Sequence, residues 1–160
     1  MRQACFLLFV FISSFAFADS KVPDACTLIT AQDVQSVVGS GFQLSPFHGM
    51  SSDYSNCGYT RGSTDKVNLT VLPASGGAAT TLAGLMKQQG ATGFKVTPVT
   101  ELGEGAYLGE KSIGGLTLKN VATLHFGKGQ LHVLLDVQIS GKPNVELEEK
   151  LGKLIYAKMQ

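Results

Sequence analysis

Apolar and polar residues alternate most clearly in two consecutive runs toward the C-terminal end of the chain. The apolar members are Leu116, Leu118, Ala122, Leu124 and Phe126 in the first run, and Leu131, Val133, Leu135, Val137 and Ile139 in the second. A period of two is typical of a strand with one buried face, so the runs predict a long β-hairpin. With Lys128-Gly129 as a two-residue turn, Phe126 pairs with Leu131. His125 then pairs with His132.

A shorter hairpin is predicted earlier in the chain. Apolar and polar residues alternate over 66–71, and a turn-rich segment at 62–65 separates this run from a second alternating run at 57–61. Shorter extended segments are expected over 42–48 and 94–100. The chain therefore contains two hairpins and additional strand material between and before them.

Three helices are predicted, each with a recognisable boundary. Thr30 and Asp33 have the spacing of a capping box, for a helix that runs to Val38. A second helix covers 78–89, and a third follows Pro143. The apolar stripe of the third helix is formed by Leu147, Leu151, Leu154 and Ile155.

The order of these elements predicts an α+β fold. Helix, hairpin and helix are followed by a strand, the long hairpin and a last helix. Strands that are neighbours in sequence, with helices between the hairpins, favour a single domain whose antiparallel sheet is covered by helices. A hairpin followed by a helix occurs twice, which suggests two similar hairpin-helix halves.

The first eighteen residues have the pattern of a signal peptide. Arg2 supplies a positive charge, Cys5–Phe15 forms a short apolar run, and Ala16-Phe17-Ala18 matches a cleavage site. We therefore expect residues 1–18 to be removed and residues 19–160 to form one exported domain, either periplasmic or secreted. The apolar run is too short to cross a bilayer and no second long run follows, so no membrane span is expected.

Removal of the leader leaves Cys26 and Cys57 as the only cysteines. Export places them in an oxidising compartment, so we interpret them as a structural disulfide, which would stabilise the fold by about 3–4 kcal/mol. A redox-active or metal-binding pair is the alternative. There is no C-x-x-C spacing, however, and two thiols lack the further ligands that zinc requires.

The charge balance narrows the classes of partner. The chain has a formal net charge of +1, and loss of Arg2 with the leader leaves twelve basic and twelve acidic side chains. Proteins that bind nucleic acids or anionic membrane surfaces need a concentrated positive field. We therefore expect no nucleic-acid partner.

Three short segments resemble the markers of a family of small exported bacterial domains. They are C-T-L-I-T-A-Q-D-V from Cys26 to Val34, C-G-Y from Cys57 to Tyr59, and L-G-E-G-A-Y at residues 102–107. The family pattern is C-x-L-L-T-x-x-E-V, C-x-Y and G-L-G-D-x-A-Y; many members are lipoproteins, and their function is mostly unassigned. Glu101 replaces the first Gly of the last marker, and the lipobox is absent. The resemblance implies an α+β fold, a disulfide between the two marker cysteines and no known catalytic set.

One face of the predicted hairpins carries the candidate binding residues. They are Lys119, Thr123, His125, His132, Asp136 and Gln138, joined by Lys66, Asn68 and Thr70 of the shorter hairpin. An antiparallel sheet often leaves one face in solvent, so we expect these side chains to lie on the side away from the helices. We hypothesise that this face contacts an envelope protein or a small ligand. A solvated face without a partner is the alternative.

The sequence contains no G-x-S-x-G, H-E-x-x-H or P-loop motif, and the glycine-punctuated segment 102–107 is expected to form a structural turn. The first hypothesis is therefore a non-enzymatic binding or interaction module of the ligand-binding, inhibitor-target or toxin-immunity type, with no cofactor. The alternative is a small metal-dependent or hydrolytic protein using His125 and His132, whose imidazoles could reach one metal ion. Two ligands do not complete a metal site, so we expect a solvated histidine pair.

Overall fold

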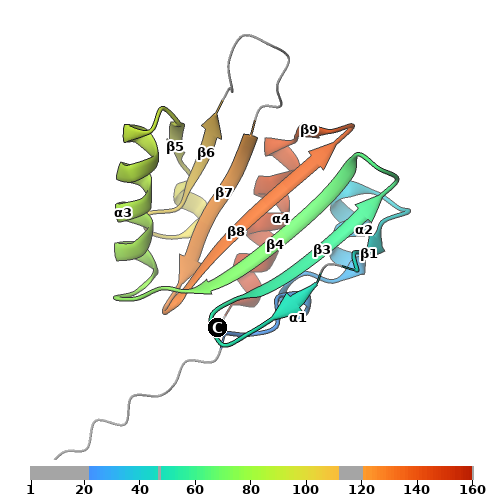
Figure 1. Ribbon diagram of the computed structural model, residues 1–160, viewed down its shortest axis with the longest axis horizontal. Helices are drawn as coiled ribbons and strands as arrows, with labels where there is room; N and C mark the ends of the chain where they lie inside the picture. Colours follow the sequence, from blue (N-terminus) through green and yellow to red (C-terminus); the bar gives the residue numbers. More distant parts are fainter. Residues whose placement is uncertain (1–21, 47, 112–120, 160) are drawn as a thin grey trace, which may run out of the picture.

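The two predicted hairpins lie side by side in one antiparallel sheet (Figure 1). This computed structural model describes residues 22–46, 48–111 and 121–159, so residues 1–18 and Lys119 lie outside the described part. Its strands are β1 (Gln43–Leu44), β2 (Gly49–Met50), β3 (Ser55–Arg61), β4 (Asp65–Pro73), β5 (Lys95–Pro98), β6 (Tyr107–Lys111), β7 (Val121–Lys128), β8 (Leu131–Ile139) and β9 (Lys142–Pro143). Its helices are α1 (Ala25–Leu28), α2 (Ala31–Val38), α3 (Ala78–Ala91) and α4 (Val145–Lys158), with a 3-10 turn η1 (Thr100–Leu102).

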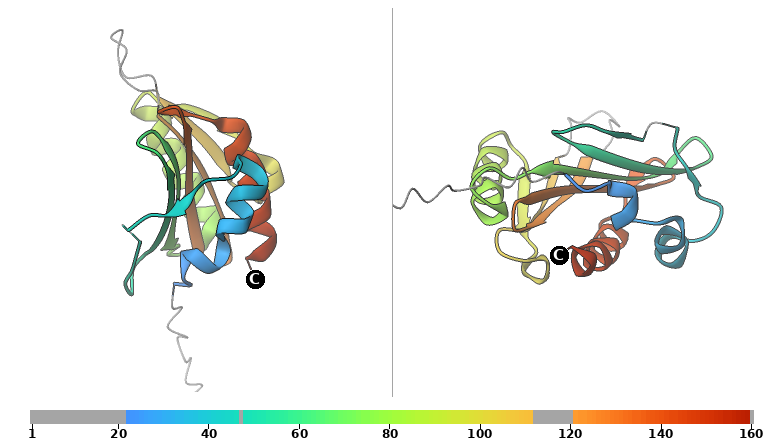
Figure 2. Two further views of the ribbon diagram at one scale, coloured as in Figure 1. Left: turned by 90° about the vertical axis from the view of Figure 1, so that its right-hand side faces the viewer. Right: turned by 90° about the horizontal axis from the view of Figure 1, so that it is seen from below.

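The strands follow the order β1-β3-β4-β8-β7-β6-β5, with β2 on β3 and β9 on β8. This arrangement confirms the α+β class and the single domain with a helix-covered antiparallel sheet. A hairpin followed by a helix occurs twice, as β3-β4-α3 and β7-β8-α4. The two helices pack on opposite faces of the sheet, however, as the two views of Figure 2 show.

Local signals located the helix boundaries well. Thr30 Oγ1 accepts a hydrogen bond from the Asp33 amide at 3.2 Å, and the Asp33 carboxylate accepts one from the Thr30 amide at 2.7 Å. This is the predicted capping box. The helix ends at Val38, and Gly39 follows with a φ of 111°. Helix α3 begins as predicted and continues to Ala91, and strand β6 was not predicted.

The predicted pairing of the long hairpin is wrong by two residues. Phe126 pairs with Val133 rather than with Leu131, because the two turn residues are Gly129 and Gln130. Gly129 has a φ of 60°, which the tight hairpin turns require at their first central position. A slip of two positions leaves every side chain on its predicted face, so the predicted apolar set still points into the core.

Helices α1, α2 and α4 cover one face of the sheet, here called the back face (Figure 2). The main core lies beneath them and includes Leu69, Leu124, Phe126, Leu135, Leu151 and Ile155, all fully buried. In the described residues, none of the helices is long and apolar enough to cross a membrane.

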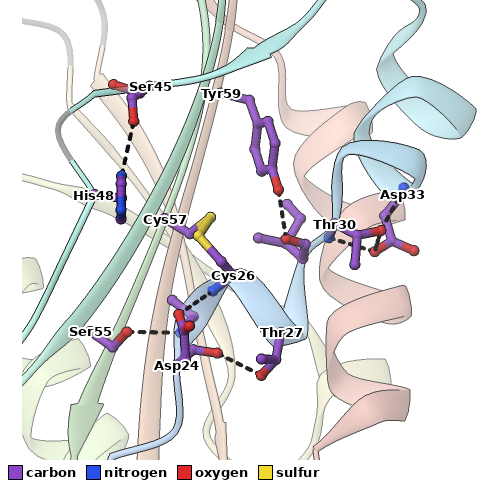
Figure 3. Close-up of a disulfide and its surroundings, with 12 residues drawn as sticks. Asp24, Cys26, Thr27, Thr30, Asp33, Ser45, His48, Ser55, Cys57 and Tyr59 are labelled. Atoms are coloured by element: carbon purple, nitrogen blue, oxygen red, sulfur yellow. Dashed lines mark hydrogen bonds between the residues drawn. A yellow bond between two sulfur atoms is a disulfide. The ribbon is translucent and has the colours of Figure 1, made fainter.

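The Cys26–Cys57 disulfide ties α1 to β3 on this back face, which confirms the predicted pairing (Figure 3). Two buried hydrogen bonds run beside it. The Ala25 amide donates to Ser55 Oγ at 2.8 Å, and the Tyr59 hydroxyl donates to the Ile29 carbonyl at 3.1 Å. The N-terminal helices are thus joined to β3 by covalent and polar contacts as well as by apolar packing.

Helix α3 lies on the opposite, front face and covers only one end of it (Figure 1). It packs over β5, β6, β7 and β8 through a small cluster of Ala78, Leu82 and Tyr107, separate from the main core. None of the described helices covers β3, β4 and the neighbouring part of β8 on this face. The expectation that the polar face lies away from all helices is therefore wrong for its α3-covered end.

Candidate functional site

The candidate binding residues fall into two groups on the front face. Thr123, Asp136 and Gln138 lie on the part that α3 leaves uncovered, whereas His125 and His132 lie beneath α3. Lys119 is outside the described residues. We call the uncovered part the open face; its polar residues are Asn56, Thr60, Lys66, Asn68, Thr70, Thr123, Asp136 and Gln138.

The register aligns these residues in rows across the strands. Thr60, Lys66 and Gln138 form one row, and Asn68 pairs with Asp136 in the next. Asn68 also pairs with Gly58, where an added Cβ would lie 3.0 Å from the Asn68 carboxamide oxygen. Because Gly58 has no side chain, the Asn68 carboxamide and the Ser45 side chain, whose Cβ would lie 3.2 Å from the added atom, both fit against β3 here.

Two hydrogen bonds bridge neighbouring strands on the open face. Thr123 Oγ1 donates to Asp136 Oδ1 at 2.6 Å, and Asn56 Nδ2 donates to Thr70 Oγ1 at 3.2 Å. Burial raises the pKa of Asp136, while the hydrogen bond from Thr123 lowers it. The face therefore presents oriented donors and acceptors on rigid strands.

Four side chains at the contact between α3 and the sheet form what we call the histidine cluster: Gln89 of α3 and Tyr107, His125 and His132 beneath it. His125 Nδ1 lies 3.2 Å from His132 Nε2, and Gln89 Nε2 lies 3.2 Å from His125 Nε2. The Tyr107 and His125 rings stack with centroids 4.5 Å apart. One pair of neutral tautomers satisfies both bonds: Gln89 donates to His125 Nε2, and His125 Nδ1–H donates to His132 Nε2.

The expectation of a solvated histidine pair is wrong. Both His125 and His132 are only 4% exposed, and they are diagonal neighbours, since His125 pairs with Leu134 and His132 with Gly127. Burial lowers the pKa of each to about 4, and for His125 the neighbouring His132 acts in the same direction. A pair of histidines on a polar strand face next to a turn is expected to be exposed to solvent. Here it is buried because α3 packs over it.

The sequence did contain one signal of this cover. An added Cβ at Gly127 would lie 2.8 Å from the Ala78 Cβ, and one at Gly109 would fall on the Gln89 carboxamide. Glycines inside strands often mark the close approach of another element. Gly109 makes room for α3, and Gly127 makes room both for α3 and for the Leu131 carbonyl of its own hairpin.

The sequence reasoning missed Glu148, a fully buried carboxyl on α4. Strand β7 pairs with β8 only from Leu124 onward, which leaves the Val137 amide free to donate to Glu148 Oε1 at 3.1 Å. Burial raises the pKa of Glu148 to about 8, and Asp136, Glu110 and Glu149 contribute in the same direction. The helical pattern places Glu148 beside the apolar stripe. It does not reveal that β7 is unpaired with β8 next to Val137, where the Glu148 carboxyl takes the place of a strand partner.

A cleft of about 310 Å³ lies between the N-terminus of α3 and the β7–β8 turn. Gly77, Thr80, Glu104, Lys128 and Tyr156 contribute to its lining. The Lys128 ammonium donates to the Met159 carbonyl at 2.7 Å. The cleft therefore combines an acidic side chain with a basic group that is already hydrogen-bonded.

Within the described residues, no group of three or more His, Cys, Asp and Glu side chains could hold a metal ion. The two histidine rings instead direct nitrogens at each other. Comparison with protein-family models, curated proteins and solved structures gives no match, so no catalytic or binding residue is transferred from a relative.

Proposed function

We propose that this protein is a non-enzymatic binding module of the bacterial envelope, periplasmic or secreted, and that it contacts a partner protein through the open face. The observation that carries the proposal is the uneven cover of the sheet. Helices close the back face, and α3 closes one end of the front face. Rows of hydrogen-bonding side chains on β3, β4 and β8 have none of the described helices over them.

Several features of the chain support this proposal. The leader-like pattern at residues 1–18 and the Cys26–Cys57 bridge fit an exported protein. The balanced charge fits a protein partner better than a nucleic acid. The resemblance to exported bacterial domains of unassigned function points in the same direction.

The form of the surface favours a protein partner, such as an inhibited target or a toxin, over a small ligand. Small molecules are usually held in concave pockets with apolar walls. The open face consists instead of strand surface with polar side chains at regular spacing. A rigid surface of this kind can match donors and acceptors on another protein over many residues.

The alternative, a metal-dependent or hydrolytic protein using His125 and His132, has less support. A catalytic base must come within hydrogen-bond reach of a substrate or of one bridging water. Both imidazoles lie beneath α3, and they use their nitrogens on Gln89 and on each other. Burial of this kind fits a structural or conformational role.

Site-specific crosslinking in envelope extract tests the proposed surface. A photoreactive residue would replace Lys66 on the open face and, as a matched control, Lys87 on the outer side of α3; both side chains are exposed. We expect Lys66 to crosslink to one defined protein and Lys87 to give no such product.

A charge substitution then tests whether contact at this face provides affinity. Asn68→Arg should weaken binding of the crosslinked protein by tenfold or more. The larger, positively charged side chain would disturb the row that Asn68 forms with Asp136 and would project into the contact surface. Lys87→Glu should leave the Kd unchanged, and the melting temperature of both variants verifies folding. Equal binding by Asn68→Arg, or capture from position 87 instead of 66, would exclude the open face as the contact surface.

A further inference from the structure

Helix α3 buries few side chains against the rest of the molecule. Of its residues only Ala78 and Leu82 are buried, with Leu85 and Met86 partly buried against them. Its N-cap residue, Gly77, has no side chain to form a capping bond, and its first amide, that of Ala78, donates to the Gly129 carbonyl of the β7–β8 turn at 2.8 Å. Glycines with positive φ stand at both ends, at 80° for Gly76 and 83° for Gly93. The helix is thus a separately packed unit between two glycine-containing connections.

The histidine cluster forms the rest of the surface on which α3 lies. Gln89, near the C-terminal end of α3, bonds to His125, which bonds to His132. The polar bonds and the apolar contacts of Leu82 therefore act together to hold the helix on the sheet.

This bonding pattern depends on proton occupancy. Two neutral imidazoles share one N–H between Nδ1 and Nε2, which lie 3.2 Å apart. When both rings are protonated, all four ring nitrogens carry protons, so two N–H groups face each other across this distance. Two positive charges would then also lie within a poorly solvated site.

Among the residues that the structure describes, the groups packed against the pair supply no compensating negative charge. Strand β6 contributes Tyr107, α3 contributes the neutral Gln89, and β4 contributes Leu72 beside His132. The nearest acid along β8 on this face is Asp136, which bonds to Thr123. The one charged side chain of α3, Lys87, is exposed.

We propose that His125 and His132 form an acid-operated latch: proton uptake by the pair releases α3 from the front face while the back face stays folded. The direction follows from linkage. Burial lowers both histidine pKa values to about 4, whereas a solvated imidazole has a value of about 6.5. The released form therefore binds more protons between these values, and attachment of α3 weakens as the pH falls from about 6.5 toward 4.

Release would uncover Tyr107, His125 and His132, which continue the open face along β6, β7 and β8. Acid would then enlarge the surface available to a partner and add positive charge to it. This consequence rests on the proposed function; the latch itself does not.

Amide hydrogen exchange of the mature, disulfide-bonded protein tests the latch without any partner. Protection factors, which correct for the intrinsic pH dependence of exchange, would be measured for α3 and α4 from pH 7 to pH 4.5. Each histidine released into solvent contributes up to about tenfold per pH unit below 6.5. We expect α3 protection to fall by between about 30-fold and 1,000-fold by pH 5, and α4 protection to fall much less.

Two conservative variants assign the effect to the pair. Asn at position 125 (His125→Asn) keeps a donor nitrogen near the place of Nδ1, and Gln at position 132 (His132→Gln) can place its carboxamide oxygen, an acceptor, near the place of Nε2; neither titrates. Each variant should lose about half of the logarithmic pH dependence of α3 protection. If one variant fails to fold, the other gives the same test.

Two results would overturn the latch. One is a parallel fall of α3 and α4 protection, which indicates global acid unfolding. The other is an unchanged pH dependence in a folded variant. Failure of the crosslinking experiment on the open face would leave these exchange results unaffected, so the two proposals are tested separately.

Discussion

Helices α3 and α4 are both 14 residues long and pack on opposite faces of the same sheet, yet they are held in different ways. Asn144 caps α4 by accepting the Leu147 amide at 3.2 Å, and Lys158 at its other end bonds to Asp33 of α2 at 2.5 Å. Helix α3 has no side-chain bond at its N-cap and contains Gly84 and Gly90. Length alone therefore says little about how firmly a helix is attached.

Burial differs between the two helices in the same direction. Helix α4 places Leu151, Gly152 and Ile155 in the main core, whereas α3 rests on a cluster of its own. Segments with few buried apolar contacts open at lower free energy than the core of a domain. We expect α3 to open locally, and α4 to be released only when the domain unfolds.

The two helices also enclose titratable groups of opposite kind. Burial raises the pKa of Glu148 under α4 to about 8 and lowers those of the two histidines under α3 to about 4. Between pH 6.5 and 8 the folded state holds one extra proton on Glu148, so stability falls as the pH rises. Between about 4.5 and 6.5 the unfolded state holds two protons on the histidines against that one, so stability falls as the pH decreases. Stability should be greatest near pH 6.5.

The largest expected effect comes from matched truncations of the two helices. Leu151 and Leu82 are both fully buried, and Leu→Ala at such a site removes about 3 kcal/mol. Leu151→Ala should lower the free energy of global unfolding by about this amount, measured by urea denaturation, and reduce amide protection throughout the sheet. Leu82→Ala should reduce protection mainly in α3. Equal loss of protection in β3 and β4 for Leu82→Ala would contradict the separate attachment of α3.

A smaller effect is expected from Glu148→Gln. The wild type should lose about 1 kcal/mol of unfolding free energy between pH 6.5 and 8, because deprotonation of Glu148 removes about 1.7 kcal/mol while loss of the histidine protons from the unfolded state restores about 0.8 kcal/mol. The Gln variant keeps only the histidine contribution, so its stability should rise by about 0.8 kcal/mol over this range. Denaturation at several pH values measures both slopes, with Glu104→Gln as the control for an exposed carboxylate. A variant that keeps the wild-type slope would show that Glu148 is not the group responsible.

The smallest expected effects are two glycine-to-alanine substitutions, which should change stability in opposite directions in the two helices. An added Cβ at Gly84 meets nothing within 4 Å, so Gly84→Ala should stabilise α3 by about 0.5–1 kcal/mol through helix propensity. An added Cβ at Gly152 lies 2.7 Å from Leu124 Cδ2 and 3.1 Å from Leu102 Cδ1. Gly152→Ala should therefore destabilise by about 1 kcal/mol, since overpacking outweighs propensity. Local exchange of α3 measures the first change, and urea denaturation measures the second; two changes of the same sign would refute the comparison.

The sequence by itself determined the features that depend on local pattern. Alternation with a period of two decided that Phe126, Val133 and Leu135 face the core, and this held although the register differs by two, because an even slip preserves the faces. The Thr30–Asp33 capping box lies within one turn of helix, and the bridge joins the two cysteines that remain after the expected leader. Each of these features is set by neighbours in sequence or by elimination among few partners.

Only the tertiary structure decided which polar residues are buried. The same alternating pattern places Thr123, His125 and Asp136 on one face, but the path of α3 covers His125 and leaves Thr123 and Asp136 on the open face. Likewise, Glu148 is buried because β7 separates from β8 beside it, which leaves the Val137 amide for its carboxyl. Burial of a polar group depends on which distant segment packs over it. Residue spacing along one strand or helix does not identify that segment, although the strand glycines Gly109 and Gly127 mark where something approaches the sheet closely.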